Sequence, residues 1–395
     1  MVVCLLSIAA VFVAKLADGT GFAELVPEIA AESIETLLSI MASSMLVIAT
    51  FSVASMVSAY ASASSTATPR SFPLIVADDA SQNALSTFVG AFIFSVVGLT
   101  AVASDYFQAT GLFVLFALTV MVFAIVIWTF VRWVDRIARL GRMGSTISKV
   151  EKATADAFKR RRDAPTLNAL KVSTAPDGRP VFAASVGYVQ HINIPALQTW
   201  AKQAEVRVVV AALPGTFAAP GRALAYVSDS PRGQAEIDYK GVVTAFQIGN
   251  ERLFDDDPRF GLVVLSEIAG RALSPAVNDP GTAISVLGTL TRLFALWREA
   301  AQTEDLAEAK FDRIEVPEVS VRDMFDDAFT AIARDGASTV EVAVRLQKTL
   351  QSLASAGDLE MREAAEYHGR LALKRAANAL SMSEDLAAVK AAAPS

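Results

Sequence analysis

The sequence predicts an α+β membrane protein with four N-terminal transmembrane helices, a cytoplasmic small β-barrel-like module and a C-terminal helical bundle. Hydrophobic residues make up 53% of its 395 residues and charged residues 19%, which is too apolar for a soluble protein of this length. Uncharged stretches fill the first third, short β-branched segments follow, and apolar residues recur at helical spacing in the last third. We therefore expect domains at residues 1–131, 132–164, 165–250 and 251–395.

Three uncharged stretches are long enough to cross a bilayer. Thr36–Tyr60, Ser86–Ser104 and Gly111–Val131 contain 25, 19 and 21 residues without a charge. At about 1.5 Å per residue, such helices span a hydrocarbon core about 30 Å thick. A charge at the bilayer centre costs about 3 kcal/mol, so its absence from all three stretches is informative. We predict three spanning helices here.

The first segment is shorter, because only Met1–Ala14 is uncharged before Lys15. We expect a short fourth spanning helix whose Lys15 side chain extends outward to the interface. Five acidic residues and no Lys or Arg lie between Asp18 and Glu35, whereas Arg132–Arg162 carries ten basic and three acidic residues. This bias predicts that the first loop is outside and that everything after the fourth helix is cytoplasmic.

A basic amphipathic helix is predicted to leave the membrane after Val131. Apolar residues recur every three or four positions from Val134 to Phe158, and the helix ends in KRRR. We expect its charges to face anionic headgroups, with a specific lipid or partner site as the alternative. The residues assigned to the membrane surface are Arg132, Arg136, Arg139, Arg142, Lys159, Arg160, Arg161 and Arg162.

The second span carries serines on one side, at Ser44, Ser55, Ser58 and Ser62. Small residues let membrane helices pack closely, and a water-filled pore would also favour hydroxyls. Phe51 interrupts the stripe, so a pore along it would be narrow or hydrophobically gated. The stripe is therefore a candidate pore or packing face.

The middle of the chain is predicted to be rich in strands. Two turns, Pro214-Gly215 and Pro220-Gly221, bracket Phe217 and favour a small compact barrel. This edge resembles biotinyl and lipoyl carrier domains, but no lysine stands at a hairpin tip, which argues against a swinging arm. The strand-like runs are residues 179–194, 204–213, 222–227 and 241–249.

The C-terminal part is predicted to be helical. Apolar residues recur at helical spacing over 259–274, 282–302, 320–335, 339–355 and 359 to about 390. Between the first two helices, the stretch RALSPAVNDPGTA, residues 271–283, reads as a corner. Ser274-Pro275 ends one helix, Asn278 or Asp279 caps the next, and Pro280 occupies its first turn.

The same corner offers an alternative interpretation. A helix N-terminus with Arg271 nearby can bind phosphate or carboxylate, and Asp257 with Arg252 precedes the same helix pair. The candidate anion or ligand pocket comprises Arg271, Ser274, Asn278, Asp279, Thr282, Asp257 and Arg252.

Several motifs together resemble a known family. They include Pro69-Arg70 after the serine-rich helix, Thr87–Gly90, Gly187–Gln190, Phe246–Gly249 and, most specifically, RALSPAVNDPGTA. The chain is similar to the bacterial predicted membrane proteins catalogued as domain of unknown function twenty-two fifty-four. The resemblance implies a bacterial inner-membrane protein with four N-terminal helices and a large cytoplasmic domain, and it implies no transferable activity. Two departures stand out, because the segment after Arg70 is less basic than in relatives and the usual Asp after Gly215 is missing.

The sequence predicts the membrane topology of the protein more firmly than it predicts the function. There is no Walker loop, GxGxxG, HExxH or CxxC motif, and only one cysteine and two histidines, so we expect no catalytic residue, metal or cofactor. The net charge of -6 argues against nucleic acid as a partner. The serine face favours a homo-oligomeric gated channel or pore with a cytoplasmic regulatory domain. The alternative is a membrane-anchored sensor or scaffold that binds a small anion in its cytoplasmic domain.

Overall fold

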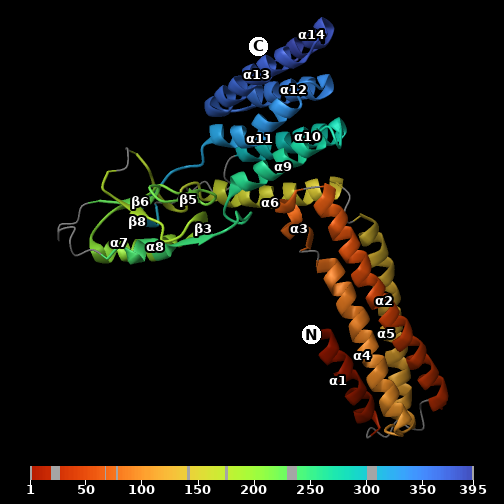
Figure 1. Cartoon of the computed structure of the whole chain (residues 1–395). Coiled ribbons are helices and arrows are strands. Elements are labelled where there is room, and N and C mark those ends of the chain that lie inside the picture. Colours follow the sequence, from red (N-terminus) through yellow and green to blue (C-terminus); the bar gives the residue numbers. More distant parts are fainter. Residues whose placement is uncertain are drawn as a thin grey trace. The chain divides into compact units, whose positions relative to one another are not determined.

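The computed structural model divides the chain into two compact units, residues 1–146 and 147–395 (Figure 1). The described residues are 2–18, 27–66, 68–76, 79–139, 143–173, 177–228, 238–299 and 309–393.

In the described residues of the first unit, every element of secondary structure is a helix. Helix α4 packs against α1, α2 and α5, which makes it the central helix of this unit (Figure 1). Large side chains such as Phe88, Phe94 and Leu115 fill the interior. The elements are α1 (Val2–Ala17), α2 (Ala31–Thr66), η2 (Pro69–Ser71), α3 (Phe72–Val76), α4 (Asp79–Ala103) and α5 (Ala109–Arg139).

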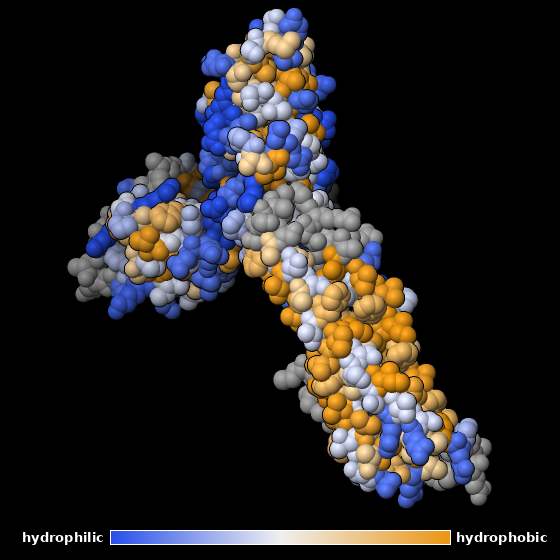
Figure 2. Space-filling model, turned by 45° about the vertical axis from the view of Figure 1, so that its right-hand side comes forward, coloured by the Kyte–Doolittle hydropathy of each residue, from blue (hydrophilic) through white to orange (hydrophobic). Residues whose placement is uncertain are grey.

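Within the described residues, three helices are long and apolar enough to cross a membrane: Ala31–Ala61, Ser81–Ala103 and Ala109–Ile137. These match the three long uncharged stretches. The predicted fourth span is a helix of 16 residues, α1, which is not among these three candidates. Figure 2 shows a broad hydrophobic surface on this unit. Its exposed apolar side chains include Val47, Phe51 and Ile127. Such a surface is suited to lipid contact.

The end of α1 is joined to the turn between α4 and α5. The Asp18 carboxylate accepts hydrogen bonds from the backbone N–H groups of Gln108 (3.0 Å) and Gly111 (2.6 Å). The Lys15 ammonium lies 3.2 Å from Asp18 and donates to the Tyr106 carbonyl at 2.6 Å. Asp18 therefore caps the start of α5, and Lys15 satisfies a carbonyl at the end of the helical hairpin.

The second unit contains two small sheets, and the single barrel expected from the sequence is not confirmed. The first sheet has the strand order β1-β8-β4-β6-β2, with β8 parallel to both neighbours. The second is antiparallel, in the order β5-β3-β7. The strands are β1 (Ala169–Lys171), β2 (Arg179–Phe182), β3 (Gly187–Ile192), β4 (Val208–Val210), β5 (Phe217–Ala218), β6 (Ala223–Val227), β7 (Phe246–Gly249) and β8 (Phe311–Val316).

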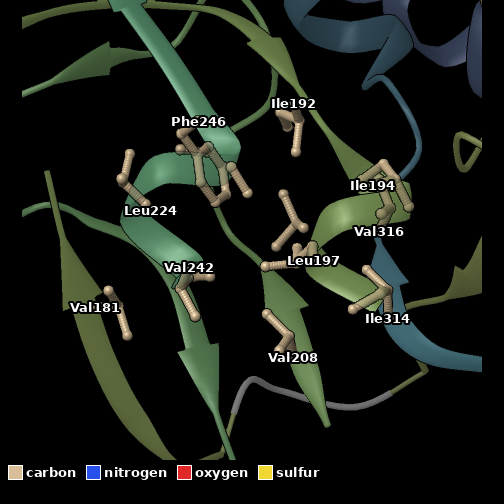
Figure 3. Packing of buried hydrophobic residues seen from close by; sticks show 14 of the residues in the cluster. Val181, Ile192, Ile194, Leu197, Val208, Leu224, Val242, Phe246, Ile314 and Val316 are labelled. Carbon is tan, nitrogen blue, oxygen red and sulfur yellow. The ribbon is translucent and has the colours of Figure 1, made fainter. Parts of the chain in front are cut away.

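Two helices, α7 (Ile194–Ala204) and α8 (Lys240–Ala245), complete this part. Leu197 of α7, Val208 of β4 and Ile314 of β8 are fully buried in one hydrophobic core (Figure 3). Alternate residues of β4 are buried, as expected for a strand with one face on a core. Since β8 comes after α9 and α10 in the chain, this core draws on distant segments.

The remaining helices belong to the second unit, except that α6 begins four residues before the boundary between the units. They are α6 (Met143–Asp163), α9 (Pro258–Ala272), α10 (Pro280–Arg298), α11 (Val321–Asp335), α12 (Val340–Ala356), α13 (Leu359–Ala379) and α14 (Ser383–Ala391). The sequence predicted one helix from 359 to about 390, but it ends at Ala379 and a second begins at Ser383. Buried aromatic rings from α10 and α11, Phe294 and Phe325, pack 4.5 Å apart between centroids.

Helix α6 is held closely against α9 and α10. Gly261 of α9 lies so near Thr154 of α6 that a Cβ at position 261 would overlap the Thr154 hydroxyl. The Arg292 guanidinium of α10 binds both oxygens of Glu151 at 2.7 and 2.8 Å. These contacts fix the position of the basic C-terminal end of α6.

Candidate functional site

A cavity of about 370 Å³ lies in the second unit, at the start of α9. Its walls come from the end of α6, the Pro214-Gly215 turn before β5, the segment between β7 and α9, and the start of α11. Four arginines and three carboxylates line it: Arg161, Arg222, Arg252, Arg259, Asp257, Glu318 and Asp323. The lining is therefore rich in charged side chains and carries one excess positive charge.

Asp257 organises one wall. Its carboxylate caps α9 by accepting the Arg259 N–H at 3.1 Å, and it binds Arg252 through two hydrogen bonds of 2.6 and 3.0 Å. Asp257 is only 3% exposed. Gly215 has φ +92, and a Cβ there would overlap the Asp257 carboxylate. The Pro-Gly turn thus needs glycine for its backbone angle and for the close approach of Asp257.

Arg259 is fixed by two carboxylates of α11. Its guanidinium donates to Asp327 and to Asp323, each at 2.7 Å. Burial raises the pKa of the Asp327 carboxyl, although Arg259 beside it acts in the opposite direction. Arg252 and Arg259 are therefore both engaged with acidic side chains and serve to hold the wall together.

Arg161 differs from these two arginines. It is 4% exposed, its Nη2 lies 3.5 Å from the Asp256 carbonyl, and its Nη1 has no hydrogen-bond partner within the described residues. Burial lowers the pKa of the Arg161 guanidinium, and the charges of Asp256 and Asp257 oppose this shift. Arginine nevertheless stays protonated in proteins, so a cation is buried here with an unused donor.

Arg222 stands at the exposed edge of the cavity. Glu318, which precedes α11 in the chain, forms an ion pair of 2.7 Å with Lys171. Among the residues that the structure describes, no carboxylate lies within ion-pair distance of Arg161 or Arg222. Planar guanidinium groups bind phosphate and carboxylate through paired N–H donors, so these two arginines form a suitable anion-binding pair.

The residues of the predicted anion pocket are divided between the two ends of α9. Arg252 and Asp257 belong to the cavity, whereas the residues of the RALSPAVNDPGTA stretch lie at the other end, about 22 Å away for 15 residues at 1.5 Å each. The structure does not bring the two groups together, because α9 separates them. The residues at the far end are Arg271, Ser274, Asn278, Asp279 and Thr282.

The far end has the geometry of a capped corner. The Ser274 hydroxyl donates to the Arg271 carbonyl at 2.7 Å, and Asn278 adopts a left-handed φ of 49°. Asp279 caps α10, accepting the backbone N–H and the hydroxyl of Thr282 at 3.0 and 2.6 Å. These hydrogen bonds from Thr282 lower the pKa of Asp279. The helix N-terminus that could bind an anion is therefore satisfied by its own carboxylate.

The predicted membrane-surface assignment is wrong for Arg161, which is buried in the second unit. Its neighbours also make contacts there, since Arg160 donates to the Asp255 carbonyl at 3.1 Å and Arg162 to the Leu296 carbonyl at 3.3 Å. Lys159 is exposed. Sequence periodicity could have shown this, because Arg161 follows Phe158 by three residues on the buried face of α6.

The other basic residues of that run lie elsewhere. Arg132 and Arg136 are exposed near the end of α5. The side chain of Arg139 and the whole of Arg142 lie outside the described residues.

The serine face of α2 is mixed in character. The Ser44 hydroxyl donates to the Ile40 carbonyl at 2.6 Å, Ser55 is half-buried and Ser58 is exposed. Phe51 is 60% exposed, and its ring packs edge-on against Trp133 with centroids 6.1 Å apart. The Ser62 side chain lies outside the described residues. Ser52, not singled out from the sequence, is fully buried and its hydroxyl has no described partner.

The three consecutive aspartates do not form a metal site. Asp257 binds Arg252, Asp256 lies 2.5 Å from the His191 ring, and Asp255 contributes its carbonyl to Arg160. No group of three or more His, Cys, Asp or Glu side chains with metal-binding geometry occurs in the described part of the chain.

Several candidate spans followed by a mixed α+β unit define a membrane protein. The chain belongs to the family described as "Predicted membrane protein (DUF2254)", whose model matches residues 1–352. This confirms the resemblance drawn from the motifs.

Similar proteins carry no assigned activity. The chain is 29% identical over 143 residues to Uncharacterized protein MT1328 of Mycobacterium tuberculosis (strain CDC 1551 / Oshkosh) and to Uncharacterized protein Mb1321c of Mycobacterium bovis. The matched stretch covers 34% of this chain and 27% of each relative, so the chain spans about a quarter of their length. No solved structure matches the chain.

Proposed function

We propose that this is an inner-membrane protein whose second unit lies in the cytoplasm and senses a small anion in the cavity at the start of α9. One observation carries the proposal: Arg161 is a buried cation with an unused N–H donor on the cavity wall. A buried guanidinium with an unpaired N–H donor and no ion-paired carboxylate is costly, and a bound anion would reduce that cost.

The shape and charge of the cavity favour a phosphate-bearing or carboxylate-bearing ligand. The volume of about 370 Å³ falls within the range of small-molecule sites. Arg252 and Arg259 are neutralised by Asp257, Asp323 and Asp327, so the attraction for an anion comes from Arg161 and Arg222. Because their guanidinium forks match planar oxyanions, phosphate and carboxylate are the favoured ligand groups.

Helix α6 connects the cavity residues to α5 along the chain. It carries Arg161 near its end and follows α5 in the chain after only residues 140–142. An anion that binds Arg161 would stabilise the position of this end of α6. Such a ligand shifts the equilibrium between two conformations of the protein only to the extent that it binds one of them more tightly. The size of the signal is therefore set by the difference between the two binding free energies.

The test is thermal unfolding of the purified full-length protein in detergent, at constant ionic strength, with inorganic phosphate, pyrophosphate and nucleotides. A ligand at a hundred times its dissociation constant stabilises the native state by about 2.7 kcal/mol. We expect at least one ligand to raise the unfolding temperature of the wild type and to lose this effect in Arg161→Met. Lys159→Met, an exposed position on the same helix, is the control and should keep the effect. An unchanged wild type across all anions, or an equal shift in Arg161→Met, would refute the proposal.

A homo-oligomeric channel is the second candidate function. The half-buried Ser55 and the exposed Ser58 support it, because hydroxyls at the surface of an apolar span could line a water-filled path between protomers. Single-channel recording from the purified protein in a planar bilayer tests this candidate, with Ser55→Leu as the matched variant. Discrete openings altered by the leucine support conduction along the serine face, and a silent bilayer with folded protein argues against it.

A further inference from the structure

A second cavity, of about 540 Å³, lies in the first unit and is independent of the anion site. It is formed by the first turns of α4 and the last turns of α5. Asn83 and Thr87 come from α4, and Trp128, Arg132, Trp133 and Arg136 come from α5. Both helices are candidate spans, Ser81–Ala103 and Ala109–Ile137, so the cavity lies where two apolar segments end.

Trp133 is the least exposed of the large side chains that line this cavity. It is 3% exposed, and its ring packs against Phe51, Phe88 and Phe130 with centroid distances of 6.1, 6.2 and 6.0 Å. Its indole Nε1–H has no hydrogen-bond partner among the described residues. A buried donor is costly when it lacks an acceptor, and indole can only donate. An acceptor supplied by a ligand in the cavity beside Trp133 would remove this cost.

The rim of the cavity carries positive charge beside an aromatic side chain. The Arg132 guanidinium lies 5.4 Å from the centre of the Trp128 ring, and Trp128 is 65% exposed. Arg132, Arg136 and Asp135 leave one net positive charge on the lining. Exposed tryptophan with arginine at the end of a span is typical of the membrane–water interface, where headgroup phosphates lie.

We propose that this cavity binds the headgroup of an anionic glycerophospholipid. A phosphodiester oxygen accepts the hydrogen bond of the Trp133 Nε1–H, and the Arg132 guanidinium on the rim balances the negative charge. The acyl chains lie along the exposed apolar side chains on the same face of α5 as Trp128, which include Met121 and Ile125. This apolar strip distinguishes a lipid from free phosphate, because free phosphate would make no use of it.

The test is retention of lipid by the purified full-length protein, read by native mass spectrometry after exchange into detergent with phosphatidylglycerol, phosphatidylcholine or inorganic phosphate. Trp133→Phe removes only the N–H donor and keeps an aromatic ring in the same packing. We expect phosphatidylglycerol to bind in preference to phosphatidylcholine, and Trp133→Phe to weaken its binding about tenfold. Arg132→Gln, on the exposed rim, provides a second variant that does not depend on core packing.

Lys159→Gln is the control, since it removes an exposed positive charge outside the cavity, and it should bind lipid like the wild type. Three results would overturn the proposal. They are equal retention of the two lipids, unchanged retention in both Trp133→Phe and Arg132→Gln, and displacement of phosphatidylglycerol by inorganic phosphate at equal concentration. If Trp133→Phe unfolds, the result for Arg132→Gln decides.

Discussion

Arg161 and Arg132 come from one basic stretch of the chain, yet the structure gives them opposite surroundings. Arg161 is 4% exposed and contacts the segment before α9, whereas Arg132 is exposed beside Trp128 at the end of a candidate span. Their side chains are identical, so position on the helix decides the outcome. Arg161 continues the buried face of α6, and Arg132 lies on an exposed face of α5. The comparison teaches that a basic run near a membrane must be divided by helical face before a function is assigned.

The largest expected effect tests the buried side of this comparison. Asp257→Ala leaves the largely buried Arg252 without its carboxylate and removes the cap of α9. Breaking such a buried pair costs about 3–5 kcal/mol, so we expect a large loss of stability in the second unit. The measurement is urea unfolding of the purified protein. Asp256→Ala is the control, because Asp256 is partly exposed and pairs with exposed His191; a similar loss in both variants would contradict the assignment.

The next effect concerns the turn that faces Asp257. Gly215→Ala places a methyl group against the Asp257 carboxylate and forces a left-handed backbone angle on alanine. Overpacking together with this strain is expected to cost about 2–4 kcal/mol. Gly221→Ala is a matched control, because Gly221 also has a positive φ, +80, but a Cβ there meets no atom within 4 Å. Thermal unfolding should show the greater loss for Gly215→Ala, and equal losses would leave only backbone strain as the cause.

A smaller effect extends the comparison to the exposed cap at the other end of α9. Asp279→Ala removes the cap of α10 and should cost about 1 kcal/mol at neutral pH, while Asp279→Asn keeps the cap and should cost little. Hydrogen bonds from Thr282 hold the pKa of Asp279 below its ordinary value. Its ionised form therefore contributes stability fully above the unfolded pKa of about 3.9, and this contribution is lost as pH falls through the lower folded-state pKa. Unfolding at pH 7 and near pH 2 should show the difference between wild type and Asp279→Ala shrinking in acid; a constant difference would argue against a charged cap.

The smallest effect on stability is expected at the two arginines themselves. Arg161 has no ion-paired carboxylate among the described residues, and its removal also removes the cost of burying its charge, so Arg161→Met should not destabilise the ligand-free protein. Arg132→Met, at the surface, should change stability by less than about 0.5 kcal/mol. Urea unfolding in phosphate-free buffer compares the two variants. A loss of several kcal/mol in Arg161→Met would mean that the protein already satisfies this charge.

Much of the fold could be predicted because its signals are local. The three long uncharged stretches correspond to the candidate spans, and the caps at Asp257 and Asp279 follow from the Asp-Pro pairs. The element β8 could not be predicted in the same way, because it is a short strand between helices whose partners, β1 and β4, lie far back in the chain. The break between α13 and α14 was also missed, because Ser381, Met382 and Ser383 include neither of the residues that usually mark the end of a helix, proline and glycine.

The candidate site was predicted only in part. Arg252 and Asp257 were singled out from their position before a helix, but Arg161, Arg222 and Gly215 reach the cavity through tertiary packing. Arg161 was within reach of the sequence, because the spacing of Thr154, Phe158 and Arg161 continues one helical face. Arg222 could not be predicted from the sequence, because its place on the cavity wall depends on how the turn before β6 faces the helices.

The position of β8 has a consequence for how the chain folds as it is synthesised. The strand is inserted between β1 and β4, about 140 and 100 residues earlier in the chain. The five-stranded sheet therefore cannot be completed until α9 and α10 have already left the ribosome, and sheets that depend on such distant pairing form slowly. Until then β1 has no neighbour in the sheet, β4 has an open edge, and each is a point at which a nascent chain could be captured by a chaperone.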